Sequence, residues 1–251
     1  MTTTNNNILI ARMDDLVAKA TKTGVAASKF LTPADAVSVS EYFKHRRDIA
    51  LTIDGGFDGA ERTRAVFINP DWGEYERTEL FAALKLSYRM QDTLGHRDVL
   101  GALMALGIKR EAIGDIVVDE SFAVLVCLPE MVAYLTDNLT KAGRVGLKSE
   151  PLDLEDIPAR EEELTVKTCT VASLRLDAVI SSAFGISRTK AAELIATGHV
   201  SLNHQPCEKI NKEVVENALL SIRGMGRIKL LEVGGMSRKG RSFIKIGIYE
   251  R

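Results

Sequence analysis

Two short stretches near the C-terminus carry apolar side chains at helical spacing. In residues 176–183, a leucine, a valine, an isoleucine and an alanine stand at positions i, i+3, i+4 and i+7, which predicts an amphipathic helix that ends at Gly185. Ser187 is a suitable cap for a second helix, whose apolar positions continue to Gly198. The pattern therefore predicts two consecutive helices, each with a glycine after its last turn.

The N-terminal pattern predicts helices followed by strands. Apolar spacing indicates one helix that ends near Gly24 and a second helix over residues 32–46. Residues 49–54 and 63–68 are rich in β-forming side chains and are joined by a glycine-bearing loop, which predicts neighbouring strands. We therefore expect a helical and hairpin region over residues 1–68.

Residues 69–150 alternate between strand and helix patterns in the order β-α-β-β-α-β. Strands are predicted over residues 79–88, 115–118, 122–127 and 145–149, and helices over residues 96–106 and 129–142. This is the order of the split βαβ plait, which serves RNA-binding domains, metal carriers and small-molecule sensors alike. Phe122 is the only aromatic residue on the two middle strands, so the order does not favour RNA bases stacked on this sheet.

The rest of the chain predicts a linker and a second domain. Residues 151–163 are acidic, hold two prolines and lack apolar periodicity, so we expect an interdomain linker. Residues 164–171 alternate like a strand, and β-rich runs follow the two helices up to a final hairpin over residues 227–249. These segments predict a small α/β domain over residues 164–251, and the fold class of the chain is α+β.

Composition excludes several classes of protein. The chain has 251 residues, of which 45% are hydrophobic and 27% charged, as in a globular protein with real cores. No apolar run approaches the roughly 20 residues that a membrane helix needs, and the N-terminus lacks a signal segment, so we expect a cytoplasmic protein without membrane contact. Three cysteines without a CxxC spacing argue against disulfides and a zinc site, and we expect no metal and no cofactor.

Charge is unevenly distributed along the chain. Residues 174–251 contain 13 Lys plus Arg and 7 Asp plus Glu, a net charge of +6. The remaining residues contain 20 Lys plus Arg and 27 Asp plus Glu, a net charge of −7. A polyanion is therefore expected to bind the C-terminal part.

Positive side chains stand at the starts of both predicted C-terminal helices. Arg175 precedes the first helix, and Arg188 and Lys190 lie in the first turn of the second. First-turn N–H groups have no partner within a helix and the helix dipole is positive there, so a phosphate can dock on backbone and cations together. Each of these residues alone would more often be a solvated surface charge. Two such helix starts in succession predict a phosphate-binding surface.

The tripeptide His96-Arg97-Asp98 also occurs in the catalytic loop of protein kinases. The chain has no glycine-rich kinase loop and no Asp-Phe-Gly further on, so we interpret the tripeptide as the start of a helix. Arg97, Lys109 and Arg110 are candidates for a second RNA contact.

The segment from Ser173 to Asn203 resembles the alpha-L RNA-binding domain. Arg-Leu-Asp at one helix start, Ser-Arg-Thr-Lys-Ala at the next and Leu-Ile-x-x-Gly-x-Val-x-Leu-Asn after them carry the resemblance. This domain was first seen in a small-subunit ribosomal protein, and it occurs in pseudouridine synthases, tyrosyl-tRNA synthetases and a heat-shock ribosome-binding protein. The resemblance implies that Arg175 and Arg188 contact structured ribosomal RNA.

Further basic residues on the β-rich end extend the predicted RNA-binding set. Those at the tip of the final hairpin are either phosphate contacts or solvated residues that keep a strand edge from aggregating. The complete predicted set consists of Arg175, Arg188, Thr189, Lys190, Arg223, Arg227, Arg238, Lys239 and Arg241.

Nearly the whole chain resembles the bacterial YlmH family. The resemblance rests on the plait, the stretch HRDVLGALMALGIKR, the acidic linker, the segment GGFDGAERTRAVF and the alpha-L domain. It implies a ribosome-associated RNA-binding protein that acts in quality control on obstructed large subunits holding peptidyl-tRNA. Its implied partners are ribosomal RNA, tRNA and the large subunit, and we expect a monomer. Family members also have a cell-division phenotype, and cyanobacterial and plastid relatives are tied to photosystem II.

Two other functions stay open. Asp177 stands in an Arg-Leu-Asp triplet, the context of the catalytic aspartate in pseudouridine synthases, which share the alpha-L domain. Against an enzyme, the alpha-L pattern already accounts for Asp177 as a first-turn residue, and no separate large catalytic domain remains in the chain. The third function is a protein-protein adaptor in cell division or photosystem II biogenesis. We expect a non-catalytic RNA-binding protein.

Overall fold

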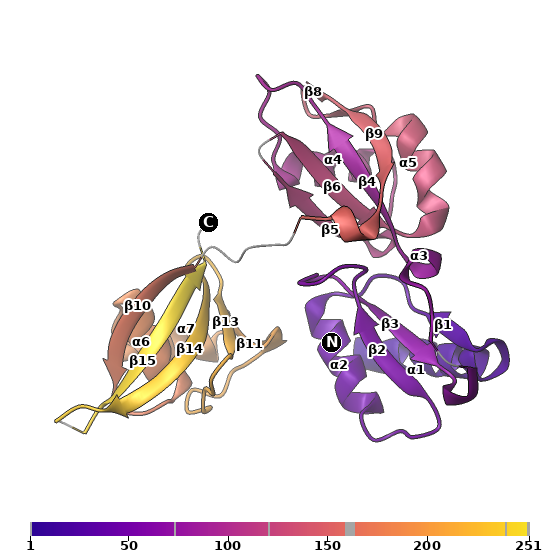
Figure 1. Cartoon of the computed structure of the whole chain (residues 1–251). Helices are drawn as coiled ribbons and strands as arrows, with labels where there is room; N and C mark the ends of the chain where they lie inside the picture. Colours follow the sequence, from indigo (N-terminus) through magenta and orange to yellow (C-terminus); the bar gives the residue numbers. More distant parts are fainter. Residues whose placement is uncertain (1, 73, 120, 159–163, 239, 250–251) are drawn as a thin grey trace. The chain divides into compact units, whose positions relative to one another are not determined.

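The structure is a computed structural model that describes residues 2–72, 74–119, 121–158, 164–238 and 240–249. It divides into two compact units, residues 1–160 and residues 161–251, and each is described by itself (Figure 1). Both units combine helices with antiparallel sheets, which confirms the predicted α+β class.

The first unit begins with two helices and a three-stranded sheet. Its elements are α1 (Thr2–Thr23), β1 (Val25–Ala27), α2 (Pro33–Phe43), β2 (Ala50–Asp54) and β3 (Arg64–Ile68), with the strands in the order β1-β3-β2. Val39 of α2 and Phe67 of β3 are fully buried in one core with residues of α1. The predicted helices and strand pair are present, and β1 is a further strand that the sequence did not indicate.

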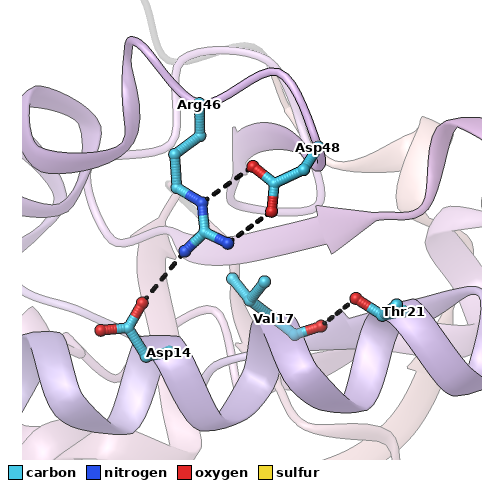
Figure 2. A network of polar contacts seen from close by, with 5 residues as sticks. All are labelled: Asp14, Val17, Thr21, Arg46 and Asp48. Carbon is cyan, nitrogen blue, oxygen red and sulfur yellow. Dashed lines mark hydrogen bonds and ion pairs between the residues drawn. The ribbon is translucent and has the colours of Figure 1, made fainter.

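One arginine ties the loop after α2 to α1 (Figure 2). Arg46 donates to both carboxylate oxygens of Asp48, from Nε at 3.0 Å and from Nη2 at 2.5 Å, and its Nη1 lies 3.2 Å from Asp14 Oδ1. Within α1, the hydroxyl of Thr21 donates to the Val17 carbonyl at 2.9 Å. Because the charged side chains are exposed to solvent, the ion pairs contribute little to stability, and apolar burial holds α1 in place.

The rest of the first unit is a four-stranded plait with α4 and α5 on one face. Its elements are η1 (Pro70–Trp72), α3 (Arg77–Leu80), β4 (Ala82–Ser87), α4 (His96–Ala105), η2 (Arg110–Ala112), β5 (Ile113–Val118), β6 (Phe122–Cys127), η3 (Pro129–Met131), α5 (Val132–Asn138), β7 (Lys141–Ala142), β8 (Val145–Gly146), β9 (Lys148–Leu152) and η4 (Leu154–Asp156). The sheet has the order β5-β6-β4-β9 with antiparallel neighbours. Leu103 of α4 and Leu135 of α5 are fully buried against Leu84 and Leu125. The chain therefore forms the predicted split βαβ plait.

Two predicted boundaries in the plait are wrong. The predicted strand over residues 79–88 begins with the end of α3, and β4 starts only at Ala82. The predicted helix over residues 129–142 leaves the helical conformation at Leu139, whose ψ is 69°. The following residues form the hairpin β7–β8, because Gly143 adopts a φ of +59° that suits a tight turn.

The predicted acidic linker is partly folded. The strand predicted over residues 145–149 is divided between β8 and β9, and β9 continues through Pro151, which is tolerated because the strand is at an edge. Ile157 is 8% exposed and packs in a core cluster of the first unit. Residues 151–157 therefore belong to that unit, and residues 159–163 of the predicted linker lie outside the described residues.

The second unit packs two helices against a six-stranded sheet (Figure 1). Its elements are β10 (Leu164–Val171), α6 (Leu176–Phe184), α7 (Arg188–Ala196), β11 (Val200–Leu202), β12 (Gln205–Pro206), β13 (Leu219–Ile222), β14 (Gly226–Met236) and β15 (Ser242–Tyr249), with the strands in the order β10-β15-β14-β13-β11-β12. Leu176, Ile180 and Ile195 of the helices are fully buried against Leu220 and Leu230 of the sheet.

The ends of α6 and α7 are those that the sequence predicts. Gly185 and Gly198 adopt left-handed φ angles of +67° and +70° after the two helices. Ser187 caps α7, since its Oγ accepts the Lys190 N–H at 3.1 Å. These local signals fix where both helices begin and end.

Candidate RNA-binding site

A buried carboxylate joins the starts of α6 and α7. Arg175 is the cap residue of α6, Asp177 lies in its first turn, and Arg188 is the first residue of α7. Arg175 donates from Nε to Asp177 Oδ1 at 3.1 Å. Arg188 donates to Asp177 Oδ2 from Nη2 at 2.5 Å and from Nε at 3.2 Å. We call these three residues the Asp177 cluster.

The Asp177 cluster is buried at its centre and exposed at its ends. The Asp177 side chain is 5% exposed, whereas those of Arg175 and Arg188 are 43% and 53% exposed. A guanidinium has several N–H donors, so each arginine keeps donors that Asp177 does not accept. Guanidinium groups held in place with donors to spare are suited to phosphate, because their planar fork matches its oxygens.

Asp177 is ionised at neutral pH. Burial raises the pKa of Asp177, but hydrogen bonds and positive charge from Arg175 and Arg188 outweigh burial, and the net shift is downward from 3.8. The carboxylate therefore holds both guanidinium groups by charge as well as by hydrogen bonds.

The first N–H groups of α6 are not available to a ligand. The Leu176 N–H donates to the Lys212 carbonyl at 2.8 Å, and the Asp177 N–H donates to the Ile210 carbonyl at 3.3 Å. The prediction that both helix starts offer backbone donors to phosphate is therefore wrong for α6, whose contribution is the Arg175 side chain.

The first turn of α7 keeps backbone donors. Its Lys190 N–H bonds to Ser187, but the N–H groups of Arg188 and Thr189 make no hydrogen bond to any described residue. On the exposed surface, the Lys190 side chain pairs with Glu193 at 3.0 Å. α7 therefore offers two N–H groups and the Arg188 side chain at the positive end of its dipole.

The remaining predicted residues of this unit do not gather in one place. Arg223 and Arg227 lie at the turn between β13 and β14, where the Arg227 guanidinium stands 5.1 Å from the centre of the Tyr249 ring. Arg238 and Arg241 lie beyond the other end of β14, roughly 30 to 35 Å away at the usual rise per residue of a strand. Arg238 is exposed, and predicted Lys239 lies outside the described residues.

Arg241 is folded back onto the sheet. Its guanidinium donates to Thr170 of β10, to the carbonyl at 2.7 Å and to Oγ1 at 3.2 Å. Thr170 is five residues before Arg175, a stretch that spans at most about 18 Å. The Arg241 guanidinium therefore contacts a residue that lies at most about 18 Å from Arg175.

The candidates for a second RNA contact are also separated. Arg97 is exposed near the start of α4, whereas Lys109 is exposed beyond its end, about 15 Å away along the helix axis. Arg110 is half-buried and donates to the carbonyls of Ile113 and Gly114 at 3.2 and 2.9 Å. Burial lowers the pKa of Arg110. Its guanidinium is thus directed into the protein.

We also searched the described residues for a metal site, a membrane-spanning helix and a reactive cysteine. They contain no group of three or more His, Cys, Asp or Glu side chains placed to hold a metal ion. No helix among them is long and apolar enough to cross a membrane. Burial raises the pKa of the Cys127 thiol to about 12, so this cysteine is an unreactive core residue.

Known proteins resemble this chain over most of its length. The family model of the YlmH RNA-binding domain matches residues 80–156, and that of the S4 domain matches residues 174–220. A protein of Bacillus subtilis (strain 168), named ribosome-associated protein quality control protein P2, is 34% identical over 217 residues, which cover 84% of this chain and 82% of that protein. The chain belongs to the YlmH family. The family resemblance stated from the sequence is thereby confirmed.

A solved structure shares the YlmH fold. The cell division protein YlmH from Streptococcus pneumoniae aligns with a TM-score of 0.51 and 23% identity, over 61% of this chain and 95% of that chain. Within the family matches, the S4 domain contains the whole Asp177 cluster, with Thr189 and Lys190. The YlmH RNA-binding domain contains Arg97 and the residues up to η4. Both units of the protein therefore carry a domain of an RNA-binding family.

Proposed function

We propose that this YlmH-family protein binds structured ribosomal RNA and tRNA through the Asp177 cluster and the first turn of α7. The proposal rests on one observation. The buried carboxylate of Asp177 fixes two half-exposed arginines, and beside them two N–H groups of α7 have no acceptor among the described residues. These donors suit phosphates better than base edges, so the protein recognises the shape of an RNA more than its sequence.

The name of a relative supports a place of action on the ribosome. The B. subtilis protein is called a ribosome-associated quality control protein, and it matches this chain across most of both lengths. Together with the family resemblance of the sequence, this name supports our proposal that the protein acts on large ribosomal subunits that are obstructed by peptidyl-tRNA. The acidic charge of the remaining residues keeps it from coating RNA without discrimination.

The state of Asp177 favours binding over catalysis. A catalytic aspartate must reach its substrate with an open carboxylate oxygen. Both oxygens of Asp177 accept hydrogen bonds from arginines, and the side chain is 5% exposed. The Arg-Leu-Asp triplet thus supports a binding surface, and we infer a non-catalytic factor instead of a pseudouridine synthase.

Co-sedimentation of the full-length protein with large subunits tests this function. The variant R175Q/D177N/R188Q removes both positive charges together with their partner, so that no lone charge is left buried. We expect about 100-fold weaker binding, which corresponds to the loss of two charge-assisted hydrogen bonds. The wild-type protein should sediment with large subunits carrying peptidyl-tRNA, and the variant should stay in the top fractions of the gradient.

The matched control is K22Q/R47Q, which changes two exposed cations of the first unit. This variant should still sediment with the subunits. Unchanged binding of R175Q/D177N/R188Q would overturn the assignment of the site. Wild-type protein confined to ribosome-free fractions, even after translation is stalled, would overturn the ribosomal role and favour a protein-protein adaptor.

A further inference from the structure

In RNA-recognition motifs, bases stack on the sheet face that the helices leave open. In this protein, residues from the N-terminal part of the first unit cover part of that face of the plait. Val124 and Val126 of β6 are fully buried there in a cluster with Phe30 and Phe57, which come from outside the plait. The Lys85 ammonium lies 4.8 Å from the centre of the ring of Phe122, which belongs to β6. The covered part of this face is closed to bases, so we looked for an RNA contact on another surface of the domain.

A basic hollow lies beside the hairpin β7–β8. It has a volume of about 680 Å³ and lies between the residues that follow β4 and the strands β8 and β9. Its charged lining consists of Arg89, Arg144, Lys148 and Asp92. Tyr88 is also among the lining residues, and its hydroxyl donates to the Asp119 carbonyl at 3.1 Å.

A second hollow shares a lining residue with the first and is also lined by residues of the hairpin. It has a volume of about 460 Å³, shares Thr140 with the first hollow and contains Arg97, Asp98 and Lys141. Among the described residues that line the two hollows, five are cationic and two are acidic. We call the surface formed by these two hollows the hairpin groove.

Most cations of the hairpin groove are available to a ligand. The side chains of Arg89, Arg97, Lys141 and Arg144 are exposed and make no ion pair or hydrogen bond to a described residue. Lys148 pairs with Glu150, outside the lining, at 2.9 Å.

The acidic side chains of the groove do not cancel this charge. Asp92 and Asp98 are the two carboxylates among the lining residues, against five cations, and Asp98 is also engaged by the Gly95 N–H at 2.9 Å in the cap of α4. The groove is therefore positive although the first unit as a whole is acidic.

A third hollow in the same unit has the opposite charge. It has a volume of about 870 Å³, and its lining contains Arg77 and the acidic residues Asp58, Glu74, Glu76, Asp153 and Glu155. A polyanion is repelled there and attracted to the hairpin groove, so the unit presents one defined side to RNA.

We propose that the hairpin groove binds the sugar-phosphate backbone of RNA and gives the protein a second RNA contact besides the Asp177 cluster. Cations line both hollows, so an RNA strand that crosses the hairpin can place phosphates in each, with Tyr88 beside a sugar or base. The contact raises the affinity for RNA that reaches both units, because the second binding event is then intramolecular.

Binding of full-length R89Q/R144Q to a purified large-subunit RNA, measured over a series of salt concentrations, tests the proposal. Removal of two phosphate contacts should weaken binding about tenfold and make the slope of log affinity against log salt shallower by roughly 1.4 to 1.8. K22Q/R47Q, which removes the same charge from exposed sites of the same unit, should leave affinity and slope unchanged.

Several outcomes would overturn the proposal. An unchanged affinity and slope for R89Q/R144Q would do so, and so would an equal loss in K22Q/R47Q, which would indicate general charge attraction. Displacement of RNA from the groove by poly-glutamate at equal charge would assign the groove to an acidic protein partner. If R89Q/R144Q melts below the wild type, R97Q/K141Q in the second hollow should give the same loss.

Ultraviolet crosslinking separates this site from the Asp177 cluster. In R175Q/D177N/R188Q, peptides with Tyr88 should still crosslink to RNA, whereas peptides of α7 should not. Crosslinks confined to residues 174–251 in the wild type would leave the Asp177 site standing and remove the hairpin groove.

Discussion

Two pairs of arginines, one pair in each unit, are held in opposite ways. In the second unit, Arg175 and Arg188 are about half exposed and are fixed by one carboxylate, that of Asp177. In the first unit, Arg64 is 9% exposed, and both Arg62 and Arg64 donate to backbone carbonyls. Arg175 and Arg188 therefore keep donors at the surface, whereas Arg62 and Arg64 use theirs inside the fold.

The acceptors of the guanidinium donors decide between these uses. Arg62 donates from Nε to the Ile113 carbonyl at 3.0 Å and from Nη2 to the carbonyls of Arg110 and Phe30 at 3.1 and 3.3 Å. Burial, together with the positive charge of Arg110, lowers the pKa of Arg62 to about 10. The Arg62 guanidinium therefore holds the segment before β3 to the plait, and few of its N–H donors remain for a phosphate. Net charge alone does not distinguish the two cases.

Arg64→Ala should have the largest effect, and it tests the structural role of a buried arginine in the first unit. Arg64 donates to the carbonyls of Ser28 and Leu80, and its guanidinium lies 6.0 and 5.5 Å from the ring centres of Phe30 and Phe81. Its loss leaves buried carbonyls without donors and removes packing, so the free energy of unfolding of the first unit should fall by about 3 kcal/mol.

Denaturant unfolding followed by the fluorescence of Trp72 measures this effect, because Trp72 is the only tryptophan and lies in the first unit. The control is Arg188→Gln, which should leave the Trp72 transition in place while RNA binding falls. A Trp72 transition that Arg64→Ala does not move would contradict the structural role of Arg64.

Asp177→Asn should have a smaller effect, and it tests whether Asp177 positions the two arginines of the second unit for RNA binding. The substitution makes the RNA-binding unit more positive, so arginines that act only as point charges would bind RNA more tightly. If Asp177 positions Arg175 and Arg188, affinity should instead fall about fivefold, because the arginines lose their fixed geometry.

Glu193→Gln is the matched control for this change in charge. Glu193 is 59% exposed and pairs with Lys190 on the surface of α7, so its loss changes the net charge equally without releasing a buried group. RNA affinity should stay the same or rise slightly in filter binding. A rise in Asp177→Asn equal to that in Glu193→Gln would show that positioning has no part in binding.

The sequence predicted those features whose signals are local. Gly185, Ser187 and Gly198 mark the ends of α6 and α7, because a cap depends on residues within one turn. The roles of Arg62 and Arg64 were not predicted, since their acceptors Ile113 and Ser28 are 51 and 36 residues away in the chain. No periodicity reports such distant contacts.

The candidate site was predicted in part for the same reason. Arg175 and Arg188 were identified from their places at helix starts, but Asp177 was interpreted only as a first-turn or catalytic residue. Its partner Arg188 is 11 residues away on another helix, and only the packing of α6 against α7 brings them together. The sequence did not separate the structural Arg110 from the exposed Arg97 either, because burial at the end of a helix depends on the sheet beneath it.

The smallest expected effect is a difference in the acid sensitivity of the two units. Each unit contains a buried aspartate, Asp177 or Asp54, whose carboxylate is ionised in the fold. Burial raises the pKa of Asp54, but hydrogen bonds from Tyr75, the Gly56 N–H and Arg77 outweigh it, and the net shift is downward from 3.8, as for Asp177.

A folded-state pKa below the unfolded value means that each carboxylate stabilises its unit above about pH 4 and loses this contribution as pH falls through the folded-state pKa. Asp54→Asn should therefore reduce the difference in stability between about pH 7 and about pH 3 in the Trp72 transition, and Asp177→Asn should not. Circular dichroism, which also follows the second unit, should show the converse for Asp177→Asn. If both substitutions reduce the pH dependence of stability in the Trp72 transition equally, the two carboxylates do not act within separate units. The two units would then not differ in the way that their aspartates contribute to stability.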